Sequence, residues 1–190
     1  MLRLFVAVEL SEEAKEEIRG AISSFSGALS GLRGLRFVSE ENWHITLLFL
    51  GERDESEIHT IEETMREAAG SLKIPLRIAM RSIGWGPNER NPRMIWANAD
   101  RPSSKILSDL KERLVAGLRK RGINAGDDKL FKGHVTLARL KDGPRASMPK
   151  IGALLHSSFI AHSVFLESSV LTPEGPIYTT LAQIDFQSRF

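Results

Sequence analysis

The sequence contains no cysteine among its 190 residues, and this absence narrows the chemistry that the protein can perform. Disulfides, thiolate metal sites and a cysteine nucleophile are all excluded. No apolar run approaches the roughly 20 residues that a membrane-spanning helix needs. The apolar run at the N-terminus is too short for a signal peptide, and Glu9 interrupts it. We therefore expect a cytoplasmic protein with no membrane partner.

Motifs that mark several common catalytic or cofactor sites are also missing. There is no HExxH or HxH pair, and no Asp or Glu stands at coordinating spacing from the two histidines discussed below, so no metal and no other cofactor is expected. The sequence has no GxSxG elbow, which argues against a serine triad. It has neither the GxxxxGK[ST] nor the GxGxxG phosphate-binding loop.

Composition indicates an ordinary globular domain, but its charge is distributed unevenly between the two halves of the chain. The chain is 42% hydrophobic and 26% charged, which is typical of a soluble protein. Its net charge of +2 divides into −3 for residues 1–95, with 12 basic and 15 acidic residues, and +5 for residues 96–190, with 14 and 9. The basic half suits a phosphate-bearing partner. Solvated helix ends and lysine-bearing loops would account for many of these charges equally well.

Two short stretches share a pattern that sets them apart from the rest of the chain. Residues 42–51 read NWHITLLFLG and residues 131–139 read FKGHVTLAR, so that His44-Ile-Thr46 in the first matches His134-Val-Thr136 in the second, 90 residues later. Both stretches are rich in β-branched and aromatic residues and predict β-strands.

Alternation along a strand assigns these side chains to faces. Residues at i and i+2 point the same way, so each histidine is expected to share a face with the threonine that follows it. Ile45, Leu47 and Phe49 are expected on the opposite, apolar face, as are Val135 and Leu137. Each strand would then supply an imidazole beside a hydroxyl, which is one half of an acid/base site.

A pair of imidazoles can perform both proton transfers of a hydrolysis. With a pKa of about 6.5, one ring can accept a proton from water while the other donates to the departing oxygen, each transfer contributing roughly 10²–10⁴ in rate. The threonine hydroxyls could hold phosphate oxygens, and Arg139 or Lys132 could stabilise developing charge. One His-x-Thr-Leu match is more often structural, but two copies on two predicted strands favour a site.

The remaining pattern alternates strands with helices. Hairpin-like connections call for antiparallel pairing. The recurrence of the His-x-Thr motif after 90 residues suggests two similar lobes within one domain over residues 1–190. The prediction is an α+β fold. Strands are expected over residues 2–8, 35–38, 73–83, 94–99, 159–170 and 177–186 besides the two histidine strands, with helices over 11–25, 54–70, 102–122 and 151–157. Three helix starts rest on Ser11 as an N-cap, on the capping-box pair Asp54 and Glu57, and on Pro102. The helix over 102–122 is expected to bury an apolar stripe, and loops are expected over 26–34, 123–129 and 141–150. The stripe consists of Ile106, Leu107, Leu110, Leu114 and Leu118.

These residues resemble the 2H phosphoesterase superfamily, whose signature is a pair of His-x-Thr/Ser motifs on facing strands. The sequence is most similar to the RNA 2′,3′-cyclic phosphodiesterase branch, also called 2′-5′ RNA ligase or LigT-like. Matching segments lie at residues 3–7, 42–51, 131–139, 166–171 and 175–181, so the resemblance covers essentially the whole chain. One departure is Gly133, where the family usually has proline.

The resemblance implies a bilobal fold in which two antiparallel sheets face a central groove, with helices packed on the outer faces. It implies metal-free hydrolysis of an RNA or nucleotide 2′,3′-cyclic phosphate to a 2′-phosphate, with ligation as the reverse reaction, by a monomer. By matching position, His44 would donate to the leaving O3′ and His134 would act as the base. The substrate-binding set would be Thr46, Thr136, Arg139 and Phe5, with Phe5 either stacking a base or packing in the core.

Three rival functions compete with hydrolysis. A non-catalytic nucleotide- or RNA-binding module on the same scaffold would not need a matched acid and base. An RNA end-joining enzyme would have to compete with bulk water. A purely structural protein is disfavoured because the sequence shows no heptads or large apolar face.

Overall fold

Among the residues that the structure describes, ten β-strands pair antiparallel into one sheet, and three α-helices cover it. The computed structural model describes residues 1–72, 76–125, 130–141, 148–173 and 175–186. The strands are β1 (Leu2–Glu9), β2 (Leu35–Phe37), β3 (His44–Arg53), β4 (Leu76–Gly86), β5 (Met94–Ala99), β6 (His134–Leu140), β7 (Ala153–Leu154), β8 (Ser158–Ala161), β9 (Ser163–Leu171) and β10 (Pro176–Asp185). The helices are α1 (Glu12–Leu29), α2 (Ile58–Gly70) and α3 (Arg101–Lys120). The α+β class with antiparallel pairing is therefore confirmed.

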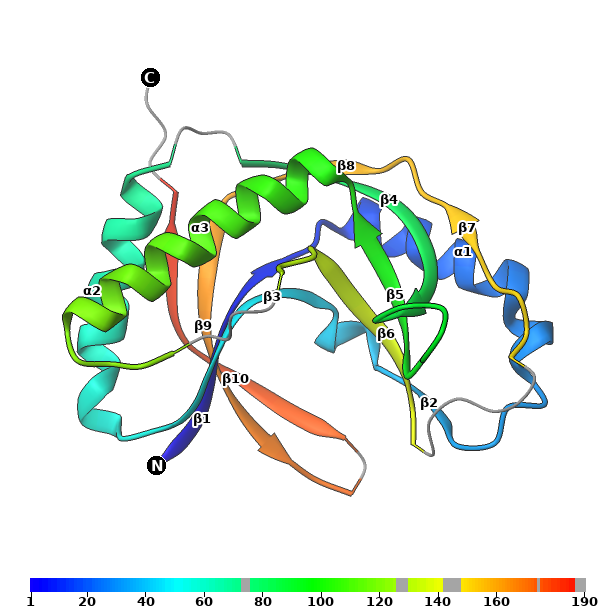
Figure 1. Ribbon diagram of the computed structural model, residues 1–190, viewed down its shortest axis with the longest axis horizontal. Coiled ribbons are helices and arrows are strands. Elements are labelled where there is room, and N and C mark those ends of the chain that lie inside the picture. Colours follow the sequence, from blue (N-terminus) through cyan, green and yellow to red (C-terminus); the bar gives the residue numbers. More distant parts are fainter. Residues whose placement is uncertain (73–75, 126–129, 142–147, 174, 187–190) are drawn as a thin grey trace.

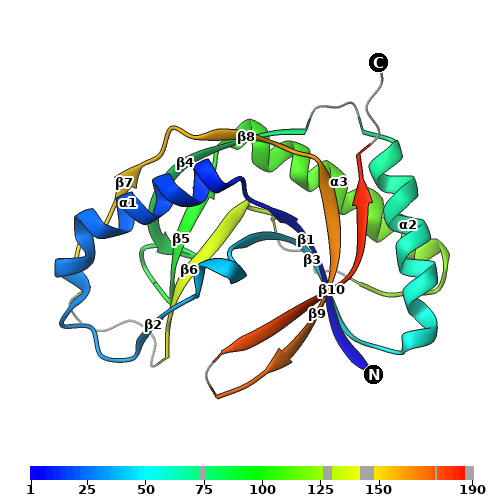
Figure 2. The ribbon, with the colours of Figure 1, turned by 180° about the vertical axis from the view of Figure 1, so that it is seen from behind.

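The sheet runs in the order β10-β9-β1-β3-β6-β5-β4-β7, with β2 added beside β6 and β8 beside β4. The family resemblance implies two antiparallel sheets; here the two sets of strands are joined at the centre through one residue pair, Ile45 and Val135. Figure 1 shows α3 crossing the near side of the molecule with α2 at one end, and Figure 2 shows α1 on the other side. The β9–β10 hairpin projects from the body in both views.

The two halves around this junction are built alike. In one half β1 leads into α1 and β3 follows; in the other β5 leads into α3 and β6 follows. Each of these helices starts with a side-chain cap. The hydroxyl of Ser11 accepts a hydrogen bond from the Ala14 N–H at 3.3 Å, and Asp100 accepts one from the Ser103 N–H at 2.8 Å. Such caps satisfy amides that have no partner within the helix.

The starts predicted for three of the four helices are confirmed. Asp54 and Glu57 form the expected reciprocal capping box, opening a short 3-10 turn that continues into α2. Pro102 lies in the first turn of α3, where its missing N–H costs no hydrogen bond. None of the helices in the described part of the chain combines the length and apolar character needed to cross a membrane.

The core is continuous across both halves. The apolar stripe predicted for α3 is buried at Leu107, Leu110, Leu114 and Leu118, but Ile106, which was expected with them, is 38% exposed. The two central strand residues, Ile45 and Val135, are completely buried. The core therefore lies on the side of the central strands opposite the two histidines.

Several predicted boundaries are wrong for tertiary reasons. The helix expected over residues 151–157 is instead an extended segment containing β7, which pairs with β4. Its backbone is held there because the Glu17 carboxylate of α1 accepts hydrogen bonds from the N–H groups of His156 and Ser157, at 2.7 and 2.8 Å. The strand expected over 159–170 divides at His162 into β8 and β9.

Of the three expected loops, one differs from the prediction and two fall largely outside the residues that the structure describes. Helix α1 continues through Ser26, where a loop was expected, because Phe25 and Leu29 both pack in the core. The loops expected over residues 123–129 and 141–150 fall largely outside the described residues.

Candidate active site

The two histidine motifs meet where the two halves of the sheet join. Antiparallel pairing through Ile45 and Val135 sets His44 across from Thr136 and Thr46 across from His134. Because Ile45 and Val135 point into the core, these four flanking side chains point to the opposite face, which we call the histidine face. Diagonal neighbours on an antiparallel pair lie about 7–8 Å apart, so the two imidazoles leave room for one phosphate group between them.

A β-bulge at the same place in each strand shifts the alternation of its side chains by one residue. In β3, Ala7 pairs with Thr46 but Val6 pairs with Leu48, so Leu47 is the extra residue. In β6, Trp96 pairs with Thr136 but Ile95 pairs with Ala138, so Leu137 is the extra residue. A bulge places two successive residues on one side of a strand. The residues after it, Phe49 and Arg139, consequently point back to the histidine face.

The bulge in β3 overturns one prediction. Simple alternation places Phe49 on the apolar face with Ile45, but Phe49 is 63% exposed and its ring centroid lies 6.1 Å from that of Phe5. Arg139, which occupies the equivalent position in β6, is exposed in the same way. The site therefore gains one aromatic ring and one guanidinium.

The ring of His44 is held at both nitrogens. Its Nδ1 lies 2.8 Å from the carbonyl oxygen of Asn42 and its Nε2 lies 2.9 Å from Oγ1 of Thr46. A carbonyl can only accept, so Nδ1 carries the proton in the neutral ring and Nε2 accepts from the threonine hydroxyl. A protonated Nε2 would instead be free to donate to a bound oxygen.

The ring of His134 repeats the first of these contacts. Its Nδ1 lies 2.7 Å from the carbonyl oxygen of Lys132, so its Nε2 is also the unprotonated nitrogen in the neutral form. Gly133, between them, donates its own N–H to Ser104 Oγ at 3.2 Å and packs against Leu107. Proline, usual at this position in the family, has no N–H for this bond.

Aromatic rings support both imidazoles. Phe5 of β1 stacks on His44 with a centroid distance of 4.9 Å, and Tyr178 of β10 meets the same imidazole edge-on at 5.3 Å. Trp96 of β5 stacks on His134 at 3.7 Å. Each catalytic candidate is thus backed by a ring from a neighbouring strand.

Burial and nearby cations disfavour the charged form of both histidines and so lower the pKa of each. Burial lowers the pKa of His44 to about 4, assisted by the positive charge of Arg139 and by His134 itself. The pKa of His134 is lowered by burial and then by Arg139 and Lys132. Such environments disfavour the imidazolium in the free protein. An anion between the rings would reverse this preference.

Arg139 is the cation common to this site. Its positive charge lowers the pKa of both histidines. It also lowers the pKa of Tyr178, which partly offsets the increase that burial causes there. Arg36 of β2 pairs directly opposite Arg139 across the sheet, and like charges in this relation repel. Among the described residues no ion pair holds either arginine. The pair therefore favours binding of an anion at this end of the histidine face.

The structure brings five of the six predicted site residues to an accessible position. The two histidines, the two threonines and Arg139 lie on the histidine face and are at least partly exposed. Phe5 also faces this side, but it is only 3% exposed because His44 covers its ring. Sequence reasoning did not assign Tyr178, Trp96 or Phe49 to the site; the alternation pattern alone gave no signal for them.

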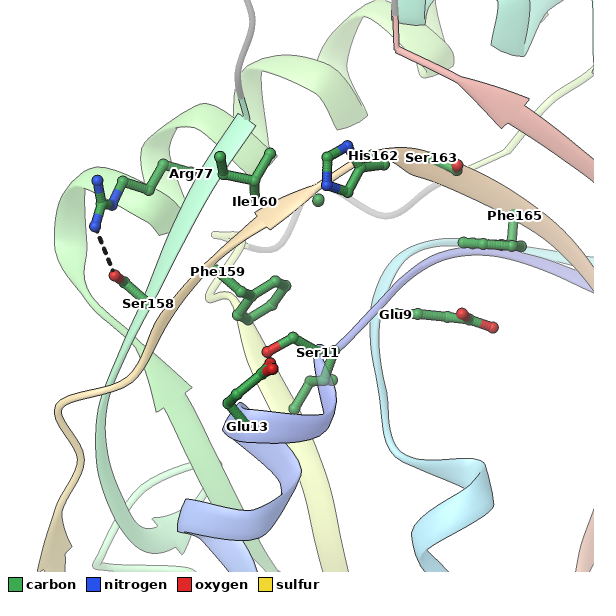
Figure 3. A pocket seen from close by; sticks show the side chains of 12 residues that line it. Glu9, Ser11, Glu13, Arg77, Ser158, Phe159, Ile160, His162, Ser163 and Phe165 are labelled. Atoms are coloured by element: carbon green, nitrogen blue, oxygen red, sulfur yellow. Dashed lines mark hydrogen bonds between the residues drawn. The ribbon is translucent and has the colours of Figure 1, made fainter.

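A cavity of about 580 Å³ lies beside this site and is distinct from it. Figure 3 shows that it opens between the start of α1 and the β8–β9 segment, with Phe159 and Phe165 among its walls. Glu9, on its rim, pairs with His44 across β1 and β3. Its walls carry no second imidazole opposite His162, so the paired chemistry belongs to the histidine face.

Metal-binding groups are sparse in the part of the chain that the structure describes. No cluster of three or more His, Asp or Glu side chains there could hold a metal ion. The two site histidines have hydroxyl, carbonyl and aromatic neighbours, which are not the donor set of a zinc or magnesium site.

Comparison with known proteins agrees with this arrangement. A family model described as LigT like Phosphoesterase matches residues 8–96. The RNA 2′,3′-cyclic phosphodiesterase of Archaeoglobus fulgidus is 33% identical, with 95% of this chain and 98% of that protein covered. The protein of the same name from Thermus thermophilus is 35% identical, with 98% and 91% covered.

Solved structures show the same fold. A Thermus thermophilus protein of known crystal structure superposes with a TM-score of 0.78 at 34% identity, covering 97% of this chain and 98% of its own. E. coli LigT in complex with 3′-AMP superposes with a TM-score of 0.71 at 24% identity, covering 98% and 99%. Taken with the two His-x-Thr strands, these similarities show that the chain belongs to the LigT-like phosphoesterase family.

Proposed function

We propose that this protein hydrolyses the 2′,3′-cyclic phosphate of an RNA end or a nucleotide to a 2′-phosphate, using His44 and His134 as a paired acid and base. The observation that carries the proposal is that the same hydrogen bond to the backbone orients each of the two imidazole rings. In each, Nδ1 is bonded to a backbone carbonyl two residues earlier, at 2.8 and 2.7 Å. This leaves both Nε2 atoms on one face of the sheet as the nitrogens that exchange protons.

The reaction follows from these assignments. A water molecule attacks phosphorus and gives a proton to Nε2 of His134, forming the new P–O bond. The P–O3′ bond breaks as Nε2–H of His44 donates its proton to O3′, so the phosphate stays on O2′. His134 returns its proton to solvent and His44 regains one, which completes the cycle.

The remaining residues act on the phosphate itself. The hydroxyls of Thr46 and Thr136 would donate to non-bridging oxygens, and Arg139 would stabilise the charge that grows on them in the transition state. Binding of the anion would also favour the imidazolium form of His44, which its surroundings disfavour in the free protein. Binding of the substrate would thus favour the protonation of His44, the residue that then donates this proton to it.

The neighbouring aromatic rings divide between support and binding. Phe5 is covered by His44 and would hold that ring in place. Phe49, exposed at the same end of the histidine face, is the better platform for stacking a base. Every group in this scheme comes from one chain, so a monomer would suffice.

The reaction can be tested by its product. Nucleoside 2′,3′-cyclic phosphates and a short RNA with a cyclic end should be converted to 2′-phosphates, identified by ³¹P NMR or by chromatography against both isomers. Release of a 3′-phosphate would contradict the assignment of His44 to O3′. Nucleotide binding without any turnover would favour the alternative, a non-catalytic RNA-binding module.

Turnover should not depend on a divalent metal. Protein dialysed against excess EDTA and assayed in its presence should retain its full rate, since the scheme uses only side-chain proton transfers and hydrogen bonds. Calcium- and magnesium-loaded EDTA serve as controls for chelator effects unrelated to metal removal. A loss of rate that zinc or manganese restores would show that a metal takes part.

Ligation is the same chemistry with a different nucleophile. If the 5′-hydroxyl of a second RNA replaces water, the same two proton transfers join the ends through a 2′-5′ linkage. Water is present in great excess, so we propose that hydrolysis dominates and that joining requires an RNA held beside the site.

A further inference from the structure

Trp96 makes the tightest aromatic contact in the site. Its indole lies 3.7 Å from the imidazole of His134, centroid to centroid, with the two planes only 25° apart. Trp96 stands on β5, directly opposite Thr136 of β6, and the next residue on its face, Asn98, is opposite His134. The indole therefore covers the side of the imidazole that β5 faces.

The indole N–H of Trp96 is buried and has no hydrogen-bond partner among the residues that the structure describes. The other two tryptophans both donate, Trp43 to the Val38 carbonyl at 3.0 Å and Trp85 to the Pro149 carbonyl at 2.9 Å. Trp96 is only 8% exposed, and no acceptor in the described part of the chain meets its Nε1. A buried donor without an acceptor is unfavourable, so the ring is not held in this position by its polar atom.

Gly86 shows what allows the indole to lie where it does. On β4, Gly86 and Gly84 share the face of Trp96, and Gly84 is its direct partner. A Cβ added to Gly86 would lie 2.6 Å from Cε2 of the indole and 2.7 Å from Cε3, well inside contact distance. The indole thus lies flat between the bare backbone of β4 and the ring of His134.

His134 needs such support more than His44 does. His44 is bonded at both nitrogens and touches Phe5 and Tyr178. Among the described residues, His134 has one hydrogen bond, to Lys132, and one ring contact, to Trp96. With Nδ1 as its single tether, the imidazole can still tilt about that bond, and a stacked ring removes this freedom.

We propose that Trp96 is a positioning residue for His134, and that Gly86 is kept free of a side chain so that the indole can stack on the imidazole. The inference rests on the proposed role of His134 as the base. The stack orients Nε2 toward the attacking water without touching the substrate. Face-to-face contact requires an aromatic ring but not the indole N–H.

The kinetic test compares an aromatic with an aliphatic replacement. Trp96→Phe should keep kcat within about threefold of the unsubstituted protein, because the stack persists. Trp96→Leu should lower kcat about 10- to 100-fold with KM little changed, because small misplacements of a reacting group cost this much. Trp85→Leu, a loss of equal size on the core face of β4, should leave kcat unchanged.

A double-mutant cycle that combines substitutions of Gly86 and Trp96 provides an independent test. Gly86→Ala alone should lower kcat by displacing the indole. In the Trp96→Leu background, where no indole remains, it should cost little more. Additive losses would overturn the inference, as would full kcat in Trp96→Leu or a Trp96→Phe enzyme as slow as Trp96→Leu.

Tryptophan fluorescence tests the stack without any assay of activity. An excited indole is quenched by an imidazolium in contact with it. With Trp43 and Trp85 replaced by Phe, emission from Trp96 should fall as pH is lowered through the titration of His134, and His134→Ala should abolish this fall. If the pH dependence is absent or survives His134→Ala, the stack is refuted. Absence of turnover in the unsubstituted protein would refute the proposed function instead.

Discussion

His44→Ala and His134→Ala should each lower the rate of cyclic phosphate hydrolysis by roughly 10²–10⁴, the usual contribution of one positioned acid or base. Each substitution removes one of the two proton transfers and leaves the other in place. Both variants should bind nucleotide about as well as the unsubstituted protein, because the threonines and Arg139 remain. The loss should therefore fall on kcat and not on KM.

A histidine outside the site provides a matched control for the effect of replacing a histidine in general. His59 lies on α2, is exposed and pairs with Glu63, so His59→Ala should keep the full rate. Circular dichroism and thermal melting would establish that all three variants are folded. Near-normal turnover in either site variant would contradict the two-imidazole mechanism.

Acidification should unfold the protein partly through His44. Burial holds the pKa of His44 at about 4 in the folded protein, against about 6.5 in an unfolded chain. Between these pH values the unfolded state binds a proton at this residue and the folded state does not. The contribution of His44 to the free energy of unfolding is therefore fully present above pH 6.5 and is lost as the pH falls toward 4. One pKa unit corresponds to about 1.4 kcal/mol, so the loss from this group is on the order of 3 kcal/mol.

Urea unfolding at a series of pH values would measure this loss. His44→Gln cannot take up the proton, so its free energy of unfolding should fall less between pH 7 and pH 4, by on the order of 3 kcal/mol. Carboxylates that titrate in the same range are common to both proteins and cancel in the difference. Parallel curves for the two proteins would show that His44 is not destabilised in its charged form. A bound phosphate should reduce the difference, since it favours the imidazolium.

The sequence alone predicted which residues form the centre of the candidate site, because the repeated motif is local. A histidine and a threonine two residues apart must share a face on any strand, and strand propensity was strong in both stretches. Helix starts were equally local: Ser11, the Asp54–Glu57 box and Pro102 act on amides within one turn of themselves. These features depend on neighbours in sequence and were confirmed.

Other features depend on partners that are distant in sequence. Residues 151–157 were predicted as a helix, but the carboxylate of Glu17 and the edge of β4 hold them extended. The two bulges were not foreseen either, because an extra residue in one strand is defined only by the register of the next. Their effect on the site is large, since they turn Phe49 and Arg139 toward the histidines.

The sequence by itself determined that two imidazole–hydroxyl pairs exist, and that helices and strands alternate around them, since spacing and capping operate over a few residues. Only the tertiary structure decided that the pairs cross at Ile45 and Val135, that Phe5 lies beneath His44, and that Trp96 lies on His134. Those outcomes follow from strand register and packing between halves of the chain 90 residues apart. No periodicity within a strand encodes which ring a neighbouring strand will place against it.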